Sequence, residues 1–249
     1  MAAGAAGCAR RGVPAVNAIL VLGFLLGMRH ALEADHVAAV ASLATRSRGA
    51  RHAMFQGAAW GLGHTITLFL ACSAVLFLDT VVPERLAQGL EVAVGAMLIL
   101  LGADVIRRML RDRVHFHTHQ HGDSVVNSHA HSHAGESGPH TSQHRHAHLR
   151  DFPVRALCVG LMHGLAGSAA LILLTLTTVA SPKLGLLYVG LFGLGSIGGM
   201  AVLSLIISVP LRSTRGFTRL HNGLQATVGL ATIVIGSLLL YDNLLAAAS

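Results

Sequence analysis

The sequence is poor in charged and aromatic residues. Only 12% of its 249 residues are Asp, Glu, Lys or Arg, whereas a soluble domain carries about 25%. This low charged fraction, together with long uncharged runs, excludes an ordinary soluble domain and indicates an integral membrane protein. Because aromatic residues make up only 4%, the apolar mass consists of Leu, Ala, Val, Ile and Gly. Small residues of this kind let transmembrane helices pack closely.

Several motifs of soluble enzymes and small secreted domains are also missing. The three cysteines, Cys8, Cys72 and Cys158, lie far apart, which argues against a disulfide framework and against a CxxC metal site. The chain has no HExxH zinc-protease motif and no phosphate-binding P-loop. Coupling to ATP would therefore need a separate subunit.

Six apolar segments run along the chain. Since about 20 apolar residues cross a bilayer, they predict an all-α integral membrane protein with six transmembrane helices. The first segment has roughly 31 residues, or about 46 Å of unbroken helix, so it must tilt, protrude or break. The segments are residues 14–44, 53–78, 86–106, 154–180, 184–211 and 224–245.

The basic residues are distributed unequally between the two sides of the predicted bundle. Thirteen arginines follow the first, third and fifth segments, whereas only four basic residues lie at the N-terminus and in the other connections. The positive-inside rule places the arginine-rich connections in the cytoplasm and both termini outside. These arginines lie between apolar spans and form no aromatic-interleaved patch, so the net charge of +7 does not indicate a nucleic-acid partner.

The two halves of the chain resemble each other. Three glycine-containing patterns recur in the same order at offsets of about 133 residues, and each half holds three segments. Because three is odd, the second unit must be inverted relative to the first, an arrangement typical of transporters. We predict a first three-helix repeat at 1–110, a histidine-rich cytoplasmic loop at 111–152 and a second repeat at 153–249. The matched patterns are residues 27–35 with 160–168, 60–66 with 192–198, and 89–95 with 223–229.

One stretch of the first segment is unusually polar. Uncharged runs flank five ionisable side chains, namely Arg29, His30, Glu33, Asp35 and His36. Ionisable groups at membrane depth cost free energy, so they usually serve a function. Imidazoles and a carboxylate suit divalent Ni²⁺, Co²⁺ or Zn²⁺. His30, Asp35 and His36 are therefore candidate metal ligands.

The spacing of these residues sets a condition on the backbone. At about 100° per helical residue, Asp35 lies about 140° and His36 about 240° from His30. All three can face one ion only where the helix is interrupted, so we predict an unwound or wide turn near residues 31–35. The alternative is a buried hydrogen-bond and salt-bridge network of these three residues with Arg29. We expect Arg29 itself to be a structural partner of Glu33 or Asp35 and not a ligand.

Other polar residues lie at positions that could complete or support this site. His64 lies in the middle of the second segment, where glycines permit close helix contact. We take it as a fourth candidate ligand, the alternative being a packed core histidine. The possible supporting or pathway residues are Glu33, Arg29, His163, Ser168 and Ser196.

Histidine is concentrated between the two repeats. Residues 115–148 contain eleven of the 17 histidines, among Ser, Gly, Gln and Thr, and this composition predicts disorder. Because such tracts bind transition metals loosely, we expect the loop to buffer or sense cytoplasmic metal; the alternative is a solvated linker. The histidines assigned to this role are His115, His117, His119, His121, His129, His131 and His133.

These motifs resemble a known family. Arg29-His-Ala-Leu-Glu-Ala-Asp-His-Val37 is similar to the signature helix of the nickel/cobalt transporter family, and Gly61-Leu-Gly-His-Thr65 resembles its second signature. Gly160-Leu-Met-His-Gly-Leu-Ala-Gly-Ser168 resembles the short urease-accessory-type nickel permease branch. The resemblance covers all six segments and implies a secondary carrier of Ni²⁺ or Co²⁺, with the site at His30, Asp35, His36 and His64. In a departure from the family pattern, Glu33 stands where Asp is common.

The sequence therefore predicts a carrier in the cytoplasmic membrane that takes up Ni²⁺ or Co²⁺, with Zn²⁺ as a possible substrate. It predicts no enzyme activity and no prosthetic group. The long histidine-rich loop resembles that of nickel/cobalt exporters, so efflux is the alternative; an intramembrane metalloenzyme and a metal sensor are two further classes. The expected partners are the metal ion, the lipid bilayer and cytoplasmic nickel chaperones or urease or hydrogenase maturation factors, without nucleic acid.

Overall fold

Four long helices form the body of the protein. The computed structural model describes residues 9–78, 83–111, 115–121, 125–131, 153–166 and 181–248. The long helices are α3 (Ala50–Leu78), α4 (Glu84–Arg111), α7 (Pro182–Ser213) and α8 (Thr218–Ala248). Each is long and apolar enough to cross a bilayer. Large apolar side chains face outward on all four, as a lipid-facing surface requires, for example Leu70, Leu100, Ile206 and Leu230.

Three shorter helices complete the predicted apolar segments as far as the structure describes them. They are α1 (Ala9–His30), α2 (Ala34–Ala44) and α5 (Val154–Ala166), and a 3₁₀ turn, η1 (Thr214–Gly216), joins α7 to α8. The first predicted segment corresponds to α1 and α2 together. The fourth begins with α5, and its remainder, residues 167–180, lies outside the described residues. The number of crossings therefore stays a prediction beyond the four long helices.

The predicted interruption of the first segment is confirmed. Helix α1 ends at His30, and α2 begins at Ala34. Between them, the backbone N–H of Leu32 donates to the carbonyl of Arg29 at 2.9 Å, which closes a tight turn. Glu33 is extended, with φ −64° and ψ 147°, and acts as the N-cap residue of α2. The chain thus breaks its helix within three residues and then resumes it.

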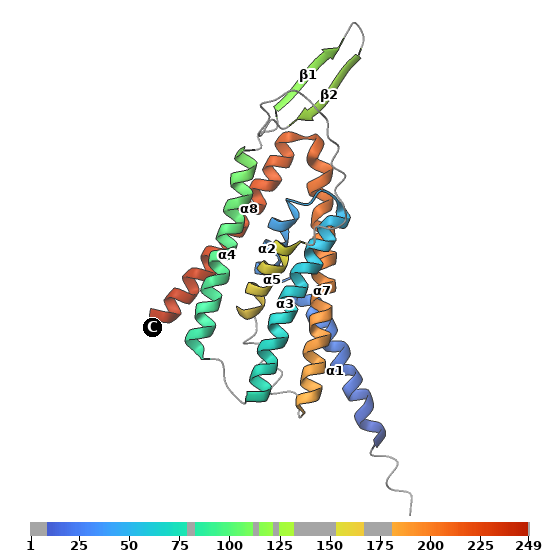
Figure 1. Ribbon diagram of the computed structural model, residues 1–249, viewed down its shortest axis with the longest axis vertical. Helices are drawn as coiled ribbons and strands as arrows, with labels where there is room; N and C mark the ends of the chain where they lie inside the picture. Colours follow the sequence, from blue (N-terminus) through green and yellow to red (C-terminus); the bar gives the residue numbers. More distant parts are fainter. Residues whose placement is uncertain are drawn as a thin grey trace, which may run out of the picture.

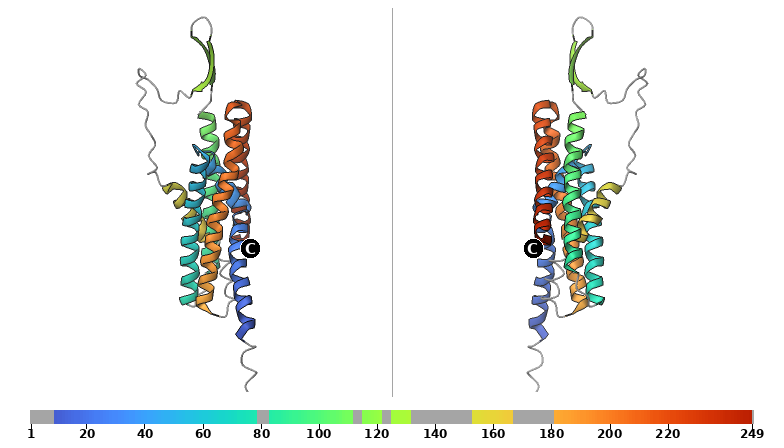
Figure 2. Two further views of the ribbon diagram at one scale, coloured as in Figure 1. Left: turned by 90° about the vertical axis from the view of Figure 1, so that its right-hand side faces the viewer. Right: turned by 90° about the vertical axis from the view of Figure 1, so that its left-hand side faces the viewer.

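The helices pack in pairs from different halves of the chain. Helix α3 lies along α7 and α4 along α8, whereas α1 packs on α7 and α5 packs on α3 (Figures 1 and 2). Helices α1, α4 and α7 run in one direction, and α3 and α8 run in the other. The short α2 packs against α7, α8 and α4. Its apolar face joins a buried core with Trp60, Leu98 and Met200.

Glycines allow the closest of these contacts. A Cβ added at Gly27 of α1 would overlap the carbonyl oxygen of Phe192 in α7. A Cβ at Gly160 of α5 would likewise overlap the carbonyl oxygen of Trp60 in α3. Only glycine fits at such distances between helix backbones. Gly27 and Gly160 are counterparts in the sequence repeat, as are Trp60 and Phe192, so corresponding residues make corresponding contacts.

The histidine-rich segment contains regular structure where its composition predicted disorder. Strands β1 (His115–His121) and β2 (Val125–His131) form an antiparallel hairpin beyond the end of α4 (Figure 1). In β1, histidine alternates with Phe116 and Thr118, and β2 begins with two valines; β-branched and aromatic residues favour extended backbone, a preference that the overall polarity of the segment concealed. The remaining tract residues, His133 among them, lie outside the described residues.

Candidate metal centre

The break between α1 and α2 brings two histidines together. His30 is the last residue of α1, and His36 lies in the first turn of α2. Their ring centroids are 4.2 Å apart in an edge-to-face arrangement. Both are buried, His36 with only 1% of its surface exposed. A continuous helix would point these rings in different directions, so the break is what allows both to face one centre.

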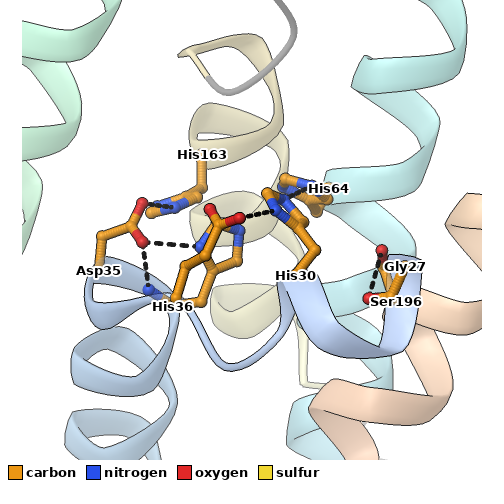
Figure 3. Close-up of polar contacts among 8 residues, drawn as sticks. Gly27, His30, Asp35, His36, His64, His163 and Ser196 are labelled. Carbon is orange, nitrogen blue, oxygen red and sulfur yellow. Dashed lines mark hydrogen bonds and ion pairs between the residues drawn. The ribbon is translucent and has the colours of Figure 1, made fainter. Parts of the chain in front are cut away.

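Two other helices each contribute one histidine to the same place. His64 comes from the middle of α3, and its Nε2 lies 3.3 Å from Nε2 of His30. His163 comes from α5, and its ring centroid lies 4.3 Å from that of His36. Both side chains are fully buried. Four imidazoles from four helices thus form one cluster inside the protein (Figure 3).

Two carboxylates hold the histidine rings from the outside of the cluster. Asp35 accepts hydrogen bonds from Nδ1 of His36 and Nε2 of His163, both at 2.9 Å (Figure 3). Its position in the first turn of α2 also favours a negative charge. Glu33 contacts Nδ1 of His30 at 2.9 Å and is more exposed than Asp35. Each ring that contacts a carboxylate is therefore oriented by it.

These hydrogen bonds assign the tautomers of the imidazoles. A carboxylate can only accept, so His36 and His30 carry their protons on Nδ1 and His163 carries its proton on Nε2. The opposite nitrogen of each ring then holds a lone pair. Among the described residues, Nε2 of His36, Nδ1 of His163 and Nδ1 of His64 have no hydrogen-bond partner. Buried ring nitrogens without partners are rare unless they serve another ligand.

The nitrogen atoms are spaced as metal ligands would be. Potential ligand atoms of His30, His36 and His64 lie within 4.8 Å of one another, as do those of Asp35, His36 and His163. Two ligands at about 2.1 Å from an ion, in tetrahedral or octahedral geometry, are about 3.0–3.4 Å apart. The 3.3 Å between Nε2 of His30 and Nε2 of His64 matches this spacing, and both nitrogens offer lone pairs when His64 carries its proton on Nδ1. The donor set of imidazole and carboxylate suits Ni²⁺, Co²⁺ or Zn²⁺.

Some of the supporting residues expected from the sequence have other roles. Arg29 is exposed and pairs with neither Glu33 nor Asp35 in the described part of the chain; both carboxylates contact histidines. Ser196 is buried, and its hydroxyl donates to the carbonyl of Gly27 at 3.2 Å, which ties α7 to α1. Ser168 lies outside the described residues.

Sequence reasoning missed one residue of the cluster. Trp60, the only tryptophan in the chain, is fully buried. Its ring centroid lies 5.3 Å from that of His36 and 5.4 Å from that of His163. It precedes His64 by four residues on α3, so the two side chains share a helix face, and this spacing was available as a signal. The indole packs against the imidazoles, and its Nε1–H has no hydrogen-bond partner among the described residues.

A second polar cluster lies near the C-terminal end of α4, around Asp104. Asp104 accepts from Arg108 on the same helix, from Arg46 in the α2–α3 connection and from Arg155 at the start of α5. Arg108 also donates to the hydroxyl of Thr45 at 3.2 Å. These contacts hold the ends of three helices together. The cluster contains one carboxylate and three permanent cations, so it is unsuited to binding a metal cation.

A family model described as high-affinity nickel-transport protein matches residues 16–216. The chain belongs to this family, named NicO. The match covers both halves of the chain and all the described residues of the imidazole cluster. It confirms the resemblance stated above and makes the chain a multi-pass membrane protein of a nickel-transport family, not an enzyme. Its transported substrate is a metal ion.

Two curated relatives agree with this assignment. The urease accessory protein UreH of a Bacillus species (strain TB-90) is 32% identical over 225 residues, covering 90% of this chain and 91% of the relative. A candidate nickel/cobalt efflux system of Methanocaldococcus jannaschii is 26% identical over 191 residues, covering 73% of each chain. No solved structure matches the chain.

Proposed function

We propose that this protein is a secondary carrier that takes up Ni²⁺ across the cytoplasmic membrane and binds the ion at His30, Asp35, His36 and His64. The main support is the buried cluster of imidazoles, in which nitrogen atoms of three histidines lie within 4.8 Å of one another. Buried histidines without a metal or proton to bind are costly in a membrane protein. Co²⁺ and Zn²⁺ accept the same ligands and are possible competitors.

We infer that the carrier consists of two inverted three-helix repeats, at 1–110 and 153–249, joined by the segment 111–152. Helix pairs such as α3 with α7 support this division. So do the matching contacts of Gly27 with Phe192 and of Gly160 with Trp60. Alternating access would follow from rocking of one repeat against the other around the cluster.

Orientation follows from the distribution of arginine. We infer that the C-terminal ends of α4 and α7 and the histidine-rich segment face the cytoplasm, because most arginines lie in the connections that follow these helix ends. Both termini then lie outside. Uptake is the favoured direction since a scarce ion must be captured by tight imidazole ligands, and the family description names high affinity. We further infer that the histidine-rich segment buffers metal near the exit and passes it to nickel chaperones or to urease or hydrogenase maturation factors.

Efflux is the second candidate function. The relative from Methanocaldococcus jannaschii is described as a nickel/cobalt efflux system, and a cytoplasmic histidine-rich segment could collect metal for export. Growth of a strain lacking the protein separates the two directions. Uptake predicts poor growth when nickel is limiting, whereas efflux predicts sensitivity to excess nickel.

Accumulation of radiolabelled Ni²⁺ by proteoliposomes tests the carrier assignment. The wild-type protein should accumulate Ni²⁺, and His36→Ala should abolish this activity because His36 lies at the centre of the cluster. His52→Ala is the matched control, since His52 is an exposed histidine on α3. Equal accumulation by wild type and His36→Ala would contradict the proposal. Competition with unlabelled Co²⁺ and Zn²⁺ measures the preference among metals.

A further inference from the structure

His36 is shared by two sets of potential metal ligands. The first set is His30, His36 and His64, from α1, α2 and α3. The second is Asp35, His36 and His163, from α2 and α5. His163 does not belong to the first set, and its ring centroid lies 6.0 Å from that of His64. The two sets thus share His36 and no other residue.

We propose that the cluster provides two alternative positions for one metal ion, with His36 as the ligand common to both. Position 1 consists of His30, His36 and His64, and position 2 consists of Asp35, His36 and His163. This inference rests on the proposed function, since it describes how the same cluster handles the transported ion. It assigns His163, which lies in the second repeat, a direct role as a metal ligand.

The hydrogen bonds show why the positions exclude each other. In the structure, the Nδ1 proton of His36 points to Asp35, which leaves the Nε2 lone pair for position 1. Position 2 needs the lone pair on Nδ1, so the proton must move to Nε2. A neutral imidazole has one lone pair only, so His36 serves one position at a time.

The same reasoning applies to His163. Its Nε2 donates to Asp35 at 2.9 Å, and its Nδ1 has no partner among the described residues. If its proton moves to Nδ1, Nε2 becomes a ligand beside the Asp35 carboxylate. Both contacts of Asp35 are 2.9 Å long, close to the roughly 3.0 Å that separates adjacent ligands of an octahedral ion. Each ring gives up a proton at one nitrogen and takes one up at the other by exchange with water, so its net charge is unchanged, and the carboxylate offsets one charge of the ion.

This arrangement links ion movement to helix movement. Position 1 depends on α1, α2 and α3, whereas position 2 joins α2 to α5. A shift of α5 relative to α2 separates His163 from Asp35 and His36, the other ligands of position 2. The ion leaves Nε2 of His36 in position 1 and binds Nδ1 of the same ring in position 2 once the proton has changed nitrogens, and this change of position accompanies the conformational change.

Nickel binding by the full-length chain tests the proposal. In every arm the histidines of residues 115–148 are replaced by serine, so that this segment adds no imidazole. The substitutions are His64→Gln, His163→Gln and both together, with His52→Gln as the control. Glutamine at 163 keeps a donor toward Asp35 but offers no imidazole. The probe is NiCl₂ alone, measured by equilibrium dialysis, with imidazole ligands counted by X-ray absorption.

We expect one Ni²⁺ per chain in the parent protein. His163→Gln should retain one ion with three imidazole ligands, and His64→Gln should retain one ion with two imidazoles and a carboxylate. The double substitution should weaken binding by at least about 100-fold, more than the loss of one supporting partner. Each single substitution should slow uptake at least about tenfold, because the ion can no longer change position.

Three outcomes would overturn the proposal. These are two ions bound per parent chain, full uptake by His163→Gln, and failure of His64→Gln to bind Ni²⁺ although it purifies as a folded protein. The His64→Gln variant keeps the proposal testable even if His163→Gln does not fold. If His36→Ala also binds and transports Ni²⁺ like the parent, the proposed function fails as well. If His36→Ala is inactive but His163→Gln transports fully, only position 2 is wrong.

Discussion

The imidazole cluster and the Asp104 cluster both gather polar side chains from three or more elements. They differ in whether the side chains around the carboxylate have nitrogen atoms that could bind a cation. Around Asp35, two histidines donate to one carboxylate and keep ring nitrogens without hydrogen-bond partners. Around Asp104, three arginines donate to one carboxylate, and arginine has no lone pair to offer. Polar residues in a membrane bundle can thus form a cation site or hold helices together. Histidine partners of the carboxylate indicate the first role, and arginine partners indicate the second.

Asp35→Asn should have the largest effect among substitutions that test this comparison. The asparagine side chain is uncharged and has one acceptor oxygen in place of two. It cannot accept from both His36 and His163, so these rings lose their orientation. Removing such a supporting carboxylate weakens metal binding by about 10–100-fold. Isothermal titration of the purified protein with NiCl₂ measures the change. An unaltered Kd would show that Asp35 neither binds nor orients.

Glu33→Gln should have a smaller effect of the same kind. Glu33 contacts His30 alone, and its side chain is 57% exposed, so water can replace part of the interaction. We expect a loss of affinity of about tenfold, the lower end of the range for supporting residues. The same titration measures it. A loss of affinity larger than that of Asp35→Asn would show that Glu33 contributes more to metal binding than Asp35 does.

Asp104→Asn should lower stability and leave nickel binding unchanged. The substitution leaves three arginines without their carboxylate, but the pairs are partly exposed, so the expected cost is about 1 kcal/mol. For a chain of this size, that corresponds to a decrease in Tm of about 2–4 °C. Thermal unfolding in detergent measures the loss, with titration of NiCl₂ in parallel. A weaker Kd for Ni²⁺ would link the Asp104 cluster to the metal centre.

Replacement of the histidines at 115–148 by serine should have the smallest effect on transport. The described strands of this segment, β1 and β2, lie beyond the end of α4 and apart from the imidazole cluster, so we expect the initial rate of Ni²⁺ uptake by proteoliposomes not to change. The number of Ni²⁺ ions bound per chain should decrease, because the substitutions remove eleven imidazoles. Loss of uptake would mean that the segment belongs to the transport path.

Much of the local structure follows from residue patterns. The broken first segment was predicted because His30, Asp35 and His36 cannot share one face of a regular helix, and the structure confirms the break. Uncharged runs likewise predicted α3, α4, α7 and α8. The hairpin was not predicted, because overall polarity outweighed the alternating pattern of β1 and β2 in our interpretation. Arg29 was also expected to pair with Glu33 or Asp35, and in the structure it pairs with neither.

The sequence by itself determined which residues carry ligand chemistry, where the helix must break and which family the chain resembles, because these depend on residue type and spacing along one segment. Only the tertiary structure decided that His163 shares Asp35 with His36, that Trp60 lies behind the rings and that Asp104 collects three arginines. These contacts join residues from different helices. They depend on helix packing, which glycines such as Gly160 permit but spacing along the chain does not specify.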